Sequence, residues 1–264
     1  MELVVNGHRT WCYTGGKTLD AAKPTVVFVH GVLHDHSVWI LQSRWFAHHG
    51  WNVLALDLPG HCRSGGPPPA SVEEAARFMI ALLDAAGVEK AALVGHSFGS
   101  LIALETASRA PDRVTHLALV GTAYPMTVSP ALLDGALNDP QRTIAMVSTF
   151  SHSTLAPPLG PGSWLYGSSR ALMRRVLASN TDANVFHIGF TACNAYANGE
   201  QALAKVQCPV LFLLGEADQM TPARAARSLA QKSPAAKVVT VKAGHALMAE
   251  APDEVLSALR DFLK

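Results

Sequence analysis

The segment that most constrains the fold of this chain is 91–100, with the sequence AALVGHSFGS. A short apolar run, typical of a buried strand, ends at Gly95, and a helical pattern runs from about Ser97 to about Arg109. A serine on a tight turn between a strand and a helix presents its hydroxyl at the edge of a sheet, and the flanking glycines let strand and helix pack closely around it. The segment therefore predicts an α/β fold with a candidate nucleophile at Ser97.

Strand and helix patterns alternate along most of the chain. Apolar strand patterns at 25–29, 51–57, 114–120, 209–214 and 237–241 alternate with helical patterns at 38–49, 71–87, 223–231 and 253–263. This alternation predicts a mostly parallel twisted sheet with helices on both faces, preceded by an antiparallel hairpin around Asn6-Gly7. Between about 122 and 206 only helical and loop signals remain. We therefore expect a core of 1–121 and 207–264 and an inserted helical cap of 122–206.

Two later strand patterns end in the side chains that a serine nucleophile needs. Asp218 follows the run at 209–214, with Glu216 as an alternative acid closer to the strand, and His245 follows the run at 237–241. Because parallel strands end at the same edge of a sheet, we expect these side chains to meet Ser97 there. A serine becomes reactive when a base takes its proton and a carboxylate orients the base. The isolated pentapeptide around Ser97 is also compatible with a plain turn, so the downstream acid and base decide the interpretation.

Five motifs in this order resemble the α/β-hydrolase family, in the branch that carries a helical cap and includes carboxylesterase-like serine hydrolases. They are His30-Gly31, Asp57-Leu58-Pro59-Gly60-His61, Gly95-His96-Ser97-Phe98-Gly99, Gly215-Glu216-Ala217-Asp218 and Gly244-His245. The resemblance spans nearly the whole chain. It implies that Ser97 is the nucleophile, that His245 acts as general base and then acid, and that Asp218 orients His245. It also implies an oxyanion hole made by the backbone N–H groups of Val32 and Phe98.

The chain departs from the family pattern at Cys62, where the turn after Pro-Gly-His usually has a second glycine. We expect a small residue in a turn here rather than a reactive thiol. In the cap, Arg170, Arg174 and Arg175 predict a solvated helix face rather than a docking site for an anionic substrate. Aromatic and histidine side chains of the cap are candidates for the walls of a substrate pocket: Trp164, Tyr166, Phe186, His187 and Phe190.

The expected function is hydrolysis of a small, largely apolar carboxylic ester through an acyl-enzyme on Ser97. Thioesters, lactones and peptides are alternative substrates for the same chemistry. A carbon–carbon hydrolase is a further alternative, although such enzymes often carry a tryptophan where this chain has Ala246. An alternative of another class is a ligand sensor that turns over slowly and signals through a protein partner. Rapid turnover of a good substrate distinguishes an esterase from a sensor.

Composition excludes several other classes of protein. The net charge of +1 gives no basis for binding nucleic acid or an anionic membrane. No apolar run has the length of a signal-peptide core at the start or of a membrane span elsewhere. The four scattered cysteines predict reduced thiols, a cytoplasmic location and no zinc site. His34-Asp35-His36 lacks a third metal ligand at a recognisable spacing, so we expect neither a metal nor a cofactor.

Overall fold

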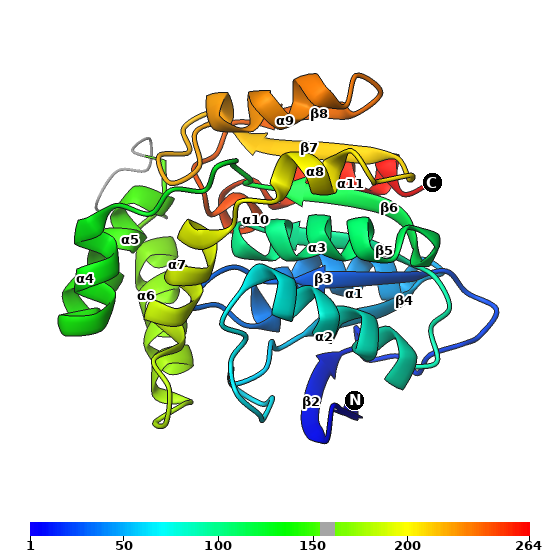
Figure 1. Cartoon of the computed structure of the whole chain (residues 1–264), viewed down its shortest axis with the longest axis horizontal. Helices are drawn as coiled ribbons and strands as arrows, with labels where there is room; N and C mark the ends of the chain where they lie inside the picture. The colour runs from blue at the N-terminus through cyan, green and yellow to red at the C-terminus, as the bar shows by residue number, and fades with distance from the viewer. Residues whose placement is uncertain (154–161) are drawn as a thin grey trace.

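The computed structural model describes the chain outside residues 154–161 and contains one eight-stranded sheet (Figure 1). In spatial order the strands are β1 (Glu2–Val5), β2 (His8–Tyr13), β4 (Asn52–Leu56), β3 (Thr25–Val29), β5 (Ala91–His96), β6 (Val114–Val120), β7 (Val210–Gly215) and β8 (Lys237–Val241). β1 and β2 pair antiparallel, as do β2 and β4, and the remaining neighbours are parallel. The predicted mostly parallel sheet is confirmed.

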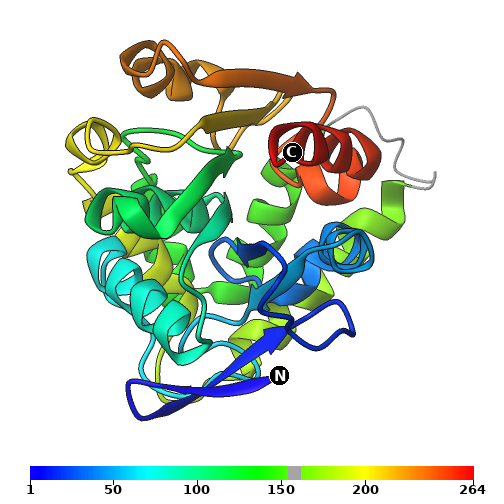
Figure 2. The same ribbon diagram turned by 90° about the vertical axis from the view of Figure 1, so that its right-hand side faces the viewer.

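Helices cover both faces of the sheet, as Figure 2 shows when the molecule is viewed from its side. One face carries α2 (Val72–Ala85) and α3 (Phe98–Arg109), and the other carries α1 (Ile40–His48), α10 (Leu247–Glu250) and α11 (Pro252–Phe262). Successive side chains of a strand point to opposite faces, so β3 feeds both cores: Val27 and Val29 enter one, and Val26 and Phe28 enter the other. Burial on both faces explains why the strand is a continuous apolar run.

Local backbone and side-chain chemistry fixes the predicted hairpin turn and the start of α2. Asn6 and Gly7 both have positive φ, at 50° and 81°, which suits the tight turn between β1 and β2. Ser71 caps α2 by accepting a hydrogen bond from the Glu74 N–H at 3.1 Å. The Glu74 carboxylate reaches back to the Ala70 N–H at 2.8 Å. The side-chain chemistry read from the sequence thus fixes where these elements begin.

Between β6 and β7, the described part of the chain consists of helices joined by loops and contains no strand. It contains α4 (Pro130–Asn138), α5 (Pro140–Ser151), α6 (Gly162–Ala178), α7 (Val185–Ala195) and α8 (Gly199–Leu203). In Figure 1, α4 to α7 gather at one end of the sheet. α8 instead packs against α3 of the core. The helical character of the segment agrees with the predicted cap, whereas its limits at 122 and 206 stay a prediction. No described helix has both the length and the apolar composition to cross a membrane.

The turn between β5 and α3 depends on two close backbone approaches. A Cβ on Gly95 would lie 2.1 Å from the Gly99 carbonyl oxygen, and a Cβ on Gly99 would lie 2.4 Å from the Val29 carbonyl oxygen. No side chain fits at either distance, so the start of α3 lies directly against the ends of β5 and β3. Ser97 is held between them at the carboxyl edge of the sheet.

Gly99→Ala is expected to destabilise the fold by about 1–3 kcal/mol, because the added methyl overlaps backbone that cannot rotate away. The matched control is Gly167→Ala in α6, where an added Cβ meets nothing within 4 Å. That change should be neutral or stabilise by up to about 1 kcal/mol, since alanine is the better helix former. Urea unfolding of both variants measures the difference. Equal stability changes in the two would contradict the close-approach argument.

Candidate active site

Ser97 occupies a strained position that its neighbours hold in place. Its φ of 53° is uncommon for a residue other than glycine. Its N–H donates to the Val120 carbonyl of β6 at 2.9 Å. Its own carbonyl accepts hydrogen bonds from Ser100, from the N–H at 2.8 Å and from the hydroxyl at 2.5 Å. The turn is therefore fixed to the sheet on one side and to α3 on the other, with the Ser97 side chain half-buried.

Asp218 and His245 come together at the same edge of the sheet. Asp218 follows β7 and His245 follows β8, and the Asp218 Oδ2 lies 2.8 Å from the His245 Nδ1. Both residues are buried, with 5% and 6% of their surface exposed. Glu216, the alternative acid, is exposed, and its backbone N–H donates to the Val241 carbonyl. Of the two carboxylates considered, the one joined to His245 is Asp218.

The surroundings of Asp218 favour its ionised form. Burial raises the pKa of Asp218, but the charge of His245 and the hydrogen bonds from His245 and Thr221 lower it more. The pKa of Asp218 is therefore lowered from its usual value of 3.8. The other carboxylate oxygen accepts from the N–H groups of Met220 and Thr221 at 2.9 and 2.7 Å. An ionised carboxylate can only accept, so the neutral His245 ring carries its proton on Nδ1. The His245 Nε2 is then free to act as a base.

The backbone of His245 is held from the neighbouring strands. The His96 Nε2 donates to the His245 carbonyl at 2.9 Å, with the two ring centroids 4.7 Å apart. Gly121, which follows β6 with φ of 54°, lies so close that an added Cβ would be 3.3 Å from the His245 Nδ1. These contacts leave the imidazole little freedom to move away from Asp218.

The two predicted oxyanion donors belong to segments that flank Ser97. Phe98 is the first residue of α3, so its N–H has no acceptor within the helix. Val32 lies in a turn closed by a hydrogen bond of 3.3 Å from the His34 N–H to the Gly31 carbonyl, with Leu33 at φ 57°. That turn does not use the Val32 N–H. A Cβ on Gly31 would lie 3.1 Å from the Ser97 Cβ, so the turn lies directly beside the serine.

The predicted pocket residues have different environments. Trp164 is 81% exposed, so its side chain lies largely in solvent rather than against a buried wall. It precedes the buried Met173 by nine residues, which at 100° per residue places it on the opposite side of α6. Phe186 and Phe190 are buried on α7 with ring centroids 4.9 Å apart.

The remaining pocket candidates lie at the cap surface and against α5. Tyr166 packs on His152 with ring centroids 4.7 Å apart, and His187 is half-buried. α7 reaches the predicted oxyanion turn, because a Cβ on Gly189 would lie 3.1 Å from the Val32 side chain. Through Gly189, α7 therefore lies directly against Val32.

The end of α6 is tied to two loops of the core. The Arg175 side chain is 59% exposed, as expected for a solvated helix face, and its guanidinium also pairs with Asp35 at 2.5 Å. The Ser179 hydroxyl accepts from the Cys62 N–H at 2.9 Å, and the Asn180 amide donates to the Gly60 carbonyl at 3.0 Å. The partners on the core side lie far from α6 in sequence, so charge patterning within the cap could not reveal them.

Cys62 occupies the position where the family usually has glycine, and its φ of 44° shows the same backbone requirement. Its Sγ lies 3.3 Å from the Asp35 Oδ2 and donates to it. Burial, followed by the negative charge of Asp35, raises the pKa of Cys62 to about 12. A protonated thiol in a hydrogen-bonded turn agrees with the structural interpretation of this residue rather than with a reactive one.

Asp35, His36 and Asp57 form a cluster whose ligand atoms lie within 4.8 Å of one another. The Asp57 Oδ1 lies 2.7 Å from the His36 Nδ1 and accepts from it, and Asp35 accepts from the backbone and hydroxyl of Ser37. The Arg175 guanidinium also forms an ion pair with Asp35. Each of the three side chains therefore has a partner: His36 and Asp57 bind each other, and Asp35 binds Ser37 and Arg175.

Several histidines around the site are buried in the neutral form. The His30 Nδ1 donates to the Gly31 carbonyl at 2.8 Å, and its Nε2 accepts from the Leu58 N–H at 3.1 Å, so protonation would break a hydrogen bond. Burial, and then the neighbouring His61, lower the pKa of His30 to about 3. Burial and the nearby His245 lower the pKa of His96 well below 6.5. The surroundings of His30 and His96 therefore favour the neutral imidazole.

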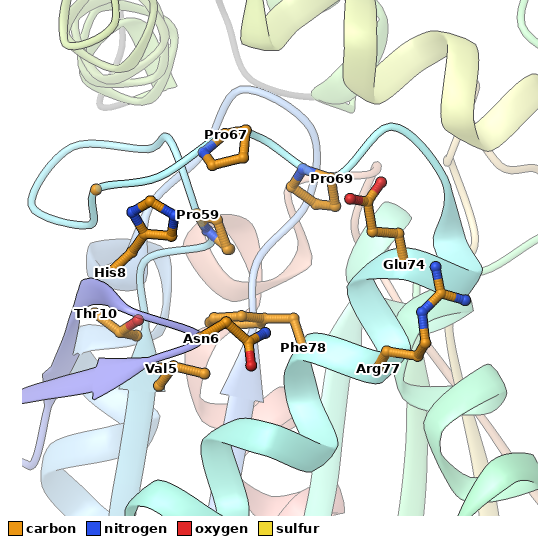
Figure 3. Close-up of a pocket in the computed structure, with 11 residues that line it drawn as sticks. Val5, Asn6, His8, Thr10, Pro59, Pro67, Pro69, Glu74, Arg77 and Phe78 are labelled. Atoms are coloured by element: carbon orange, nitrogen blue, oxygen red, sulfur yellow. The ribbon is translucent and has the colours of Figure 1, made fainter.

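A hollow of about 300 Å³ lies between the β1–β2 hairpin, the proline-rich loop before α2 and α2 itself (Figure 3). It is lined by Val5, Asn6, His8, Thr10, Pro59, Gly65, Pro67, Pro69, Glu74, Arg77 and Phe78. None of the residues predicted for catalysis is among them. This hollow is therefore not where the predicted chemistry would occur.

Residues 24–252 match the family described as alpha/beta hydrolase fold, and the chain belongs to this family. The resemblance inferred from the five motifs is thereby confirmed. An (E)-2-((N-methylformamido)methylene)succinate hydrolase from Acinetobacter baylyi is 26% identical over 249 residues, covering 90% of each chain. The enol-lactonase from Burkholderia xenovorans LB400 has the same fold, with a TM-score of 0.85 at 24% identity over 100% of this chain and 99% of that one.

A longer relative matches over part of its length. The dihydrolipoyllysine-residue acetyltransferase component of an acetoin cleaving system from Pseudomonas putida is 29% identical over 250 residues. The match covers 90% of this chain but 63% of that protein, so this chain spans less than two thirds of it. The family, with hydrolases among its members, is what these similarities have in common.

The buried neutral histidines predict loss of stability in mild acid. Between pH 6.5 and the lowered pKa values of His30 and His96, the unfolded chain binds protons that the folded chain does not. The unfolding free energy should therefore fall as pH drops from 7.5 to 5, with each such histidine contributing about tenfold per pH unit to the equilibrium constant. Urea unfolding across this range measures the slope. His30→Gln should reduce it, and the exposed-site control His8→Gln should not; a flat profile would contradict the prediction.

Proposed function

We propose that the chain is a serine hydrolase that cleaves small, largely apolar carboxylic esters through an acyl-enzyme on Ser97. The observation that carries the proposal is the buried Asp218–His245 pair, joined at 2.8 Å at the sheet edge where Ser97 is held with φ of 53°. A buried ionised carboxylate beside an imidazole, together with a serine on a strained turn, is the arrangement that nucleophilic acyl transfer needs. Membership of the family supports the proposal.

In the proposed reaction, the Ser97 hydroxyl oxygen attacks the ester carbonyl while the His245 Nε2 takes its proton. Asp218 stays ionised and stabilises the imidazolium through Nδ1–H. The N–H groups of Val32 and Phe98 stabilise the oxyanion, and each such donor is worth about 10²–10³ in kcat in a serine protease. The tetrahedral intermediate collapses, and the leaving alkoxide takes the proton from His245. Water activated by the same imidazole then releases the acid and restores Ser97.

We place the selection of substrate in the cap, provisionally residues 122–206. α7 supports this role because Gly189 lies against Val32, so the helix reaches the segment that would bind the oxyanion. The apolar rings of Phe186 and Phe190 on the same helix favour an apolar acyl group over a charged one. Trp164 has no part in this proposal, because its side chain faces away from the buried side of α6.

A fluorophosphonate probe should label Ser97, because the probe reacts only with an activated serine. Ser97→Ala should abolish both labelling and turnover of p-nitrophenyl esters from acetate to octanoate. The matched control is Ser168→Ala, which removes an exposed serine of α6 and should retain both. Mass spectrometry locates the adduct. Labelling at another serine would overturn the assignment, and a single turnover followed by a stall would favour the ligand sensor.

Asp218→Asn should lower kcat by about 10⁴-fold, the size of the loss when the corresponding acid of a serine protease is changed, because the amide cannot stabilise the imidazolium. Glu216→Gln changes the same charge two residues earlier, on an exposed side chain, and should alter kcat by less than about twofold. Steady-state kinetics on one ester compares them. If Glu216→Gln proved the more damaging change, the proposed acid would be wrong.

A further inference from the structure

We infer that Thr221 is a positioning residue whose hydroxyl holds Asp218 and His245 in their productive arrangement, an inference that rests on the proposed function. Thr221 is buried, with 4% of its surface exposed. Its Oγ1 lies 2.8 Å from the Asp218 Oδ2, 3.0 Å from the His245 Nδ1 and 2.9 Å from the Gly121 carbonyl oxygen. One hydroxyl thus contacts the acid, the base and the end of a third strand.

The proton count at this hydroxyl constrains the imidazole. A threonine hydroxyl has one proton to donate and two lone pairs that accept. The Gly121 carbonyl and the ionised Asp218 can only accept, so the hydroxyl proton goes to one of them. In both cases the Thr221 lone pairs and the Asp218 Oδ2 face the His245 Nδ1 as acceptors. They favour the tautomer with the proton on Nδ1, which leaves Nε2 to accept the proton of Ser97.

The backbone around Thr221 fixes the hydroxyl in this position. The Asp218 Oδ1 accepts from the Thr221 N–H at 2.7 Å, so acid and threonine are joined by backbone as well as by side chain. Gly121 follows β6, and its N–H donates to the Leu213 carbonyl of β7 at 2.9 Å. The hydroxyl therefore connects the ends of β6, β7 and β8, which supply Gly121, Asp218 and His245 respectively.

Removing the hydroxyl leaves the buried Gly121 carbonyl and the Asp218 Oδ2 with one donor fewer to share. It also removes the second acceptor that faces the His245 Nδ1, so the ring gains freedom to tilt. Hydrogen bonds to charged groups carry enough energy for a loss of about 10–100-fold in rate. The loss should appear in kcat and leave KM nearly unchanged, because the acid–base pair does not bind the acyl group.

Two substitutions separate the hydroxyl from the shape of the side chain. Thr221→Val keeps the volume and removes the hydroxyl, whereas Thr221→Ser keeps the hydroxyl and removes the methyl group. A positioning role predicts that the valine variant loses about 10–100-fold in kcat and that the serine variant stays within about threefold of wild type. A packing role predicts the reverse order. The low-field NMR resonance of the proton between His245 and Asp218 should weaken or shift in the valine variant and persist in the serine variant.

The outcomes distinguish this inference from the proposed function. If wild-type protein is not labelled at Ser97 by the fluorophosphonate probe, the proposed function fails. If Ser97 is labelled and esters turn over, but Thr221→Val has wild-type kcat and an unchanged resonance, the inference alone fails. Circular dichroism checks folding of each variant. Should Thr221→Val not fold, Thr221→Ala replaces it, and a tenfold loss of kcat in folded Thr221→Ser would also overturn the inference.

Discussion

The close approach of backbone at the β5–α3 turn determines where Ser97 lies and what can pack around it. Because Gly95 and Gly99 have no Cβ, the start of α3 lies against the ends of both β5 and β3. Ser97 can then be held at positive φ, with its N–H bonded to Val120 on β6. The turn that carries the serine is thus supported by three strands. Gly31 completes this support by bringing the next turn against the Ser97 Cβ.

Near that turn, the buried Asp218 carboxylate is held by several hydrogen bonds, whereas the His96 Nδ1 is buried without a partner among the described residues. Asp218 receives hydrogen bonds from two backbone N–H groups and from His245, and the Thr221 hydroxyl lies 2.8 Å from it, so it stays ionised although it is buried. The surroundings of His30 and His96 have the opposite effect on charge, because they favour the uncharged ring. The site therefore holds a negative charge on Asp218, while the His30 and His96 rings remain neutral.

The order of the elements and the sheet edge at which Ser97, Asp218 and His245 lie could be predicted, because both follow from local patterns. Buried parallel strands are continuous apolar runs, and the residue that follows each run lies at the carboxyl edge. Trp164 shows where this reasoning ends: an aromatic residue in a helical pattern does not say which side of the helix is buried. Arg175 and Thr221 show a second limit, since their partners Asp35 and His245 are distant in sequence and only the tertiary structure brings them together.

The attachment of α6 to the core has a mechanical consequence. Asp35, which Arg175 binds, lies three residues after Val32 on the same short loop, and that loop also packs against Gly189 of α7. A tilt of α6 that carries Arg175 with it pulls on the segment beside the serine. The ion pair therefore connects the cap to the loop whose Val32 N–H would stabilise charge on the substrate. Under the proposed function, a change at Arg175 would therefore affect both the cap and the loop beside Ser97.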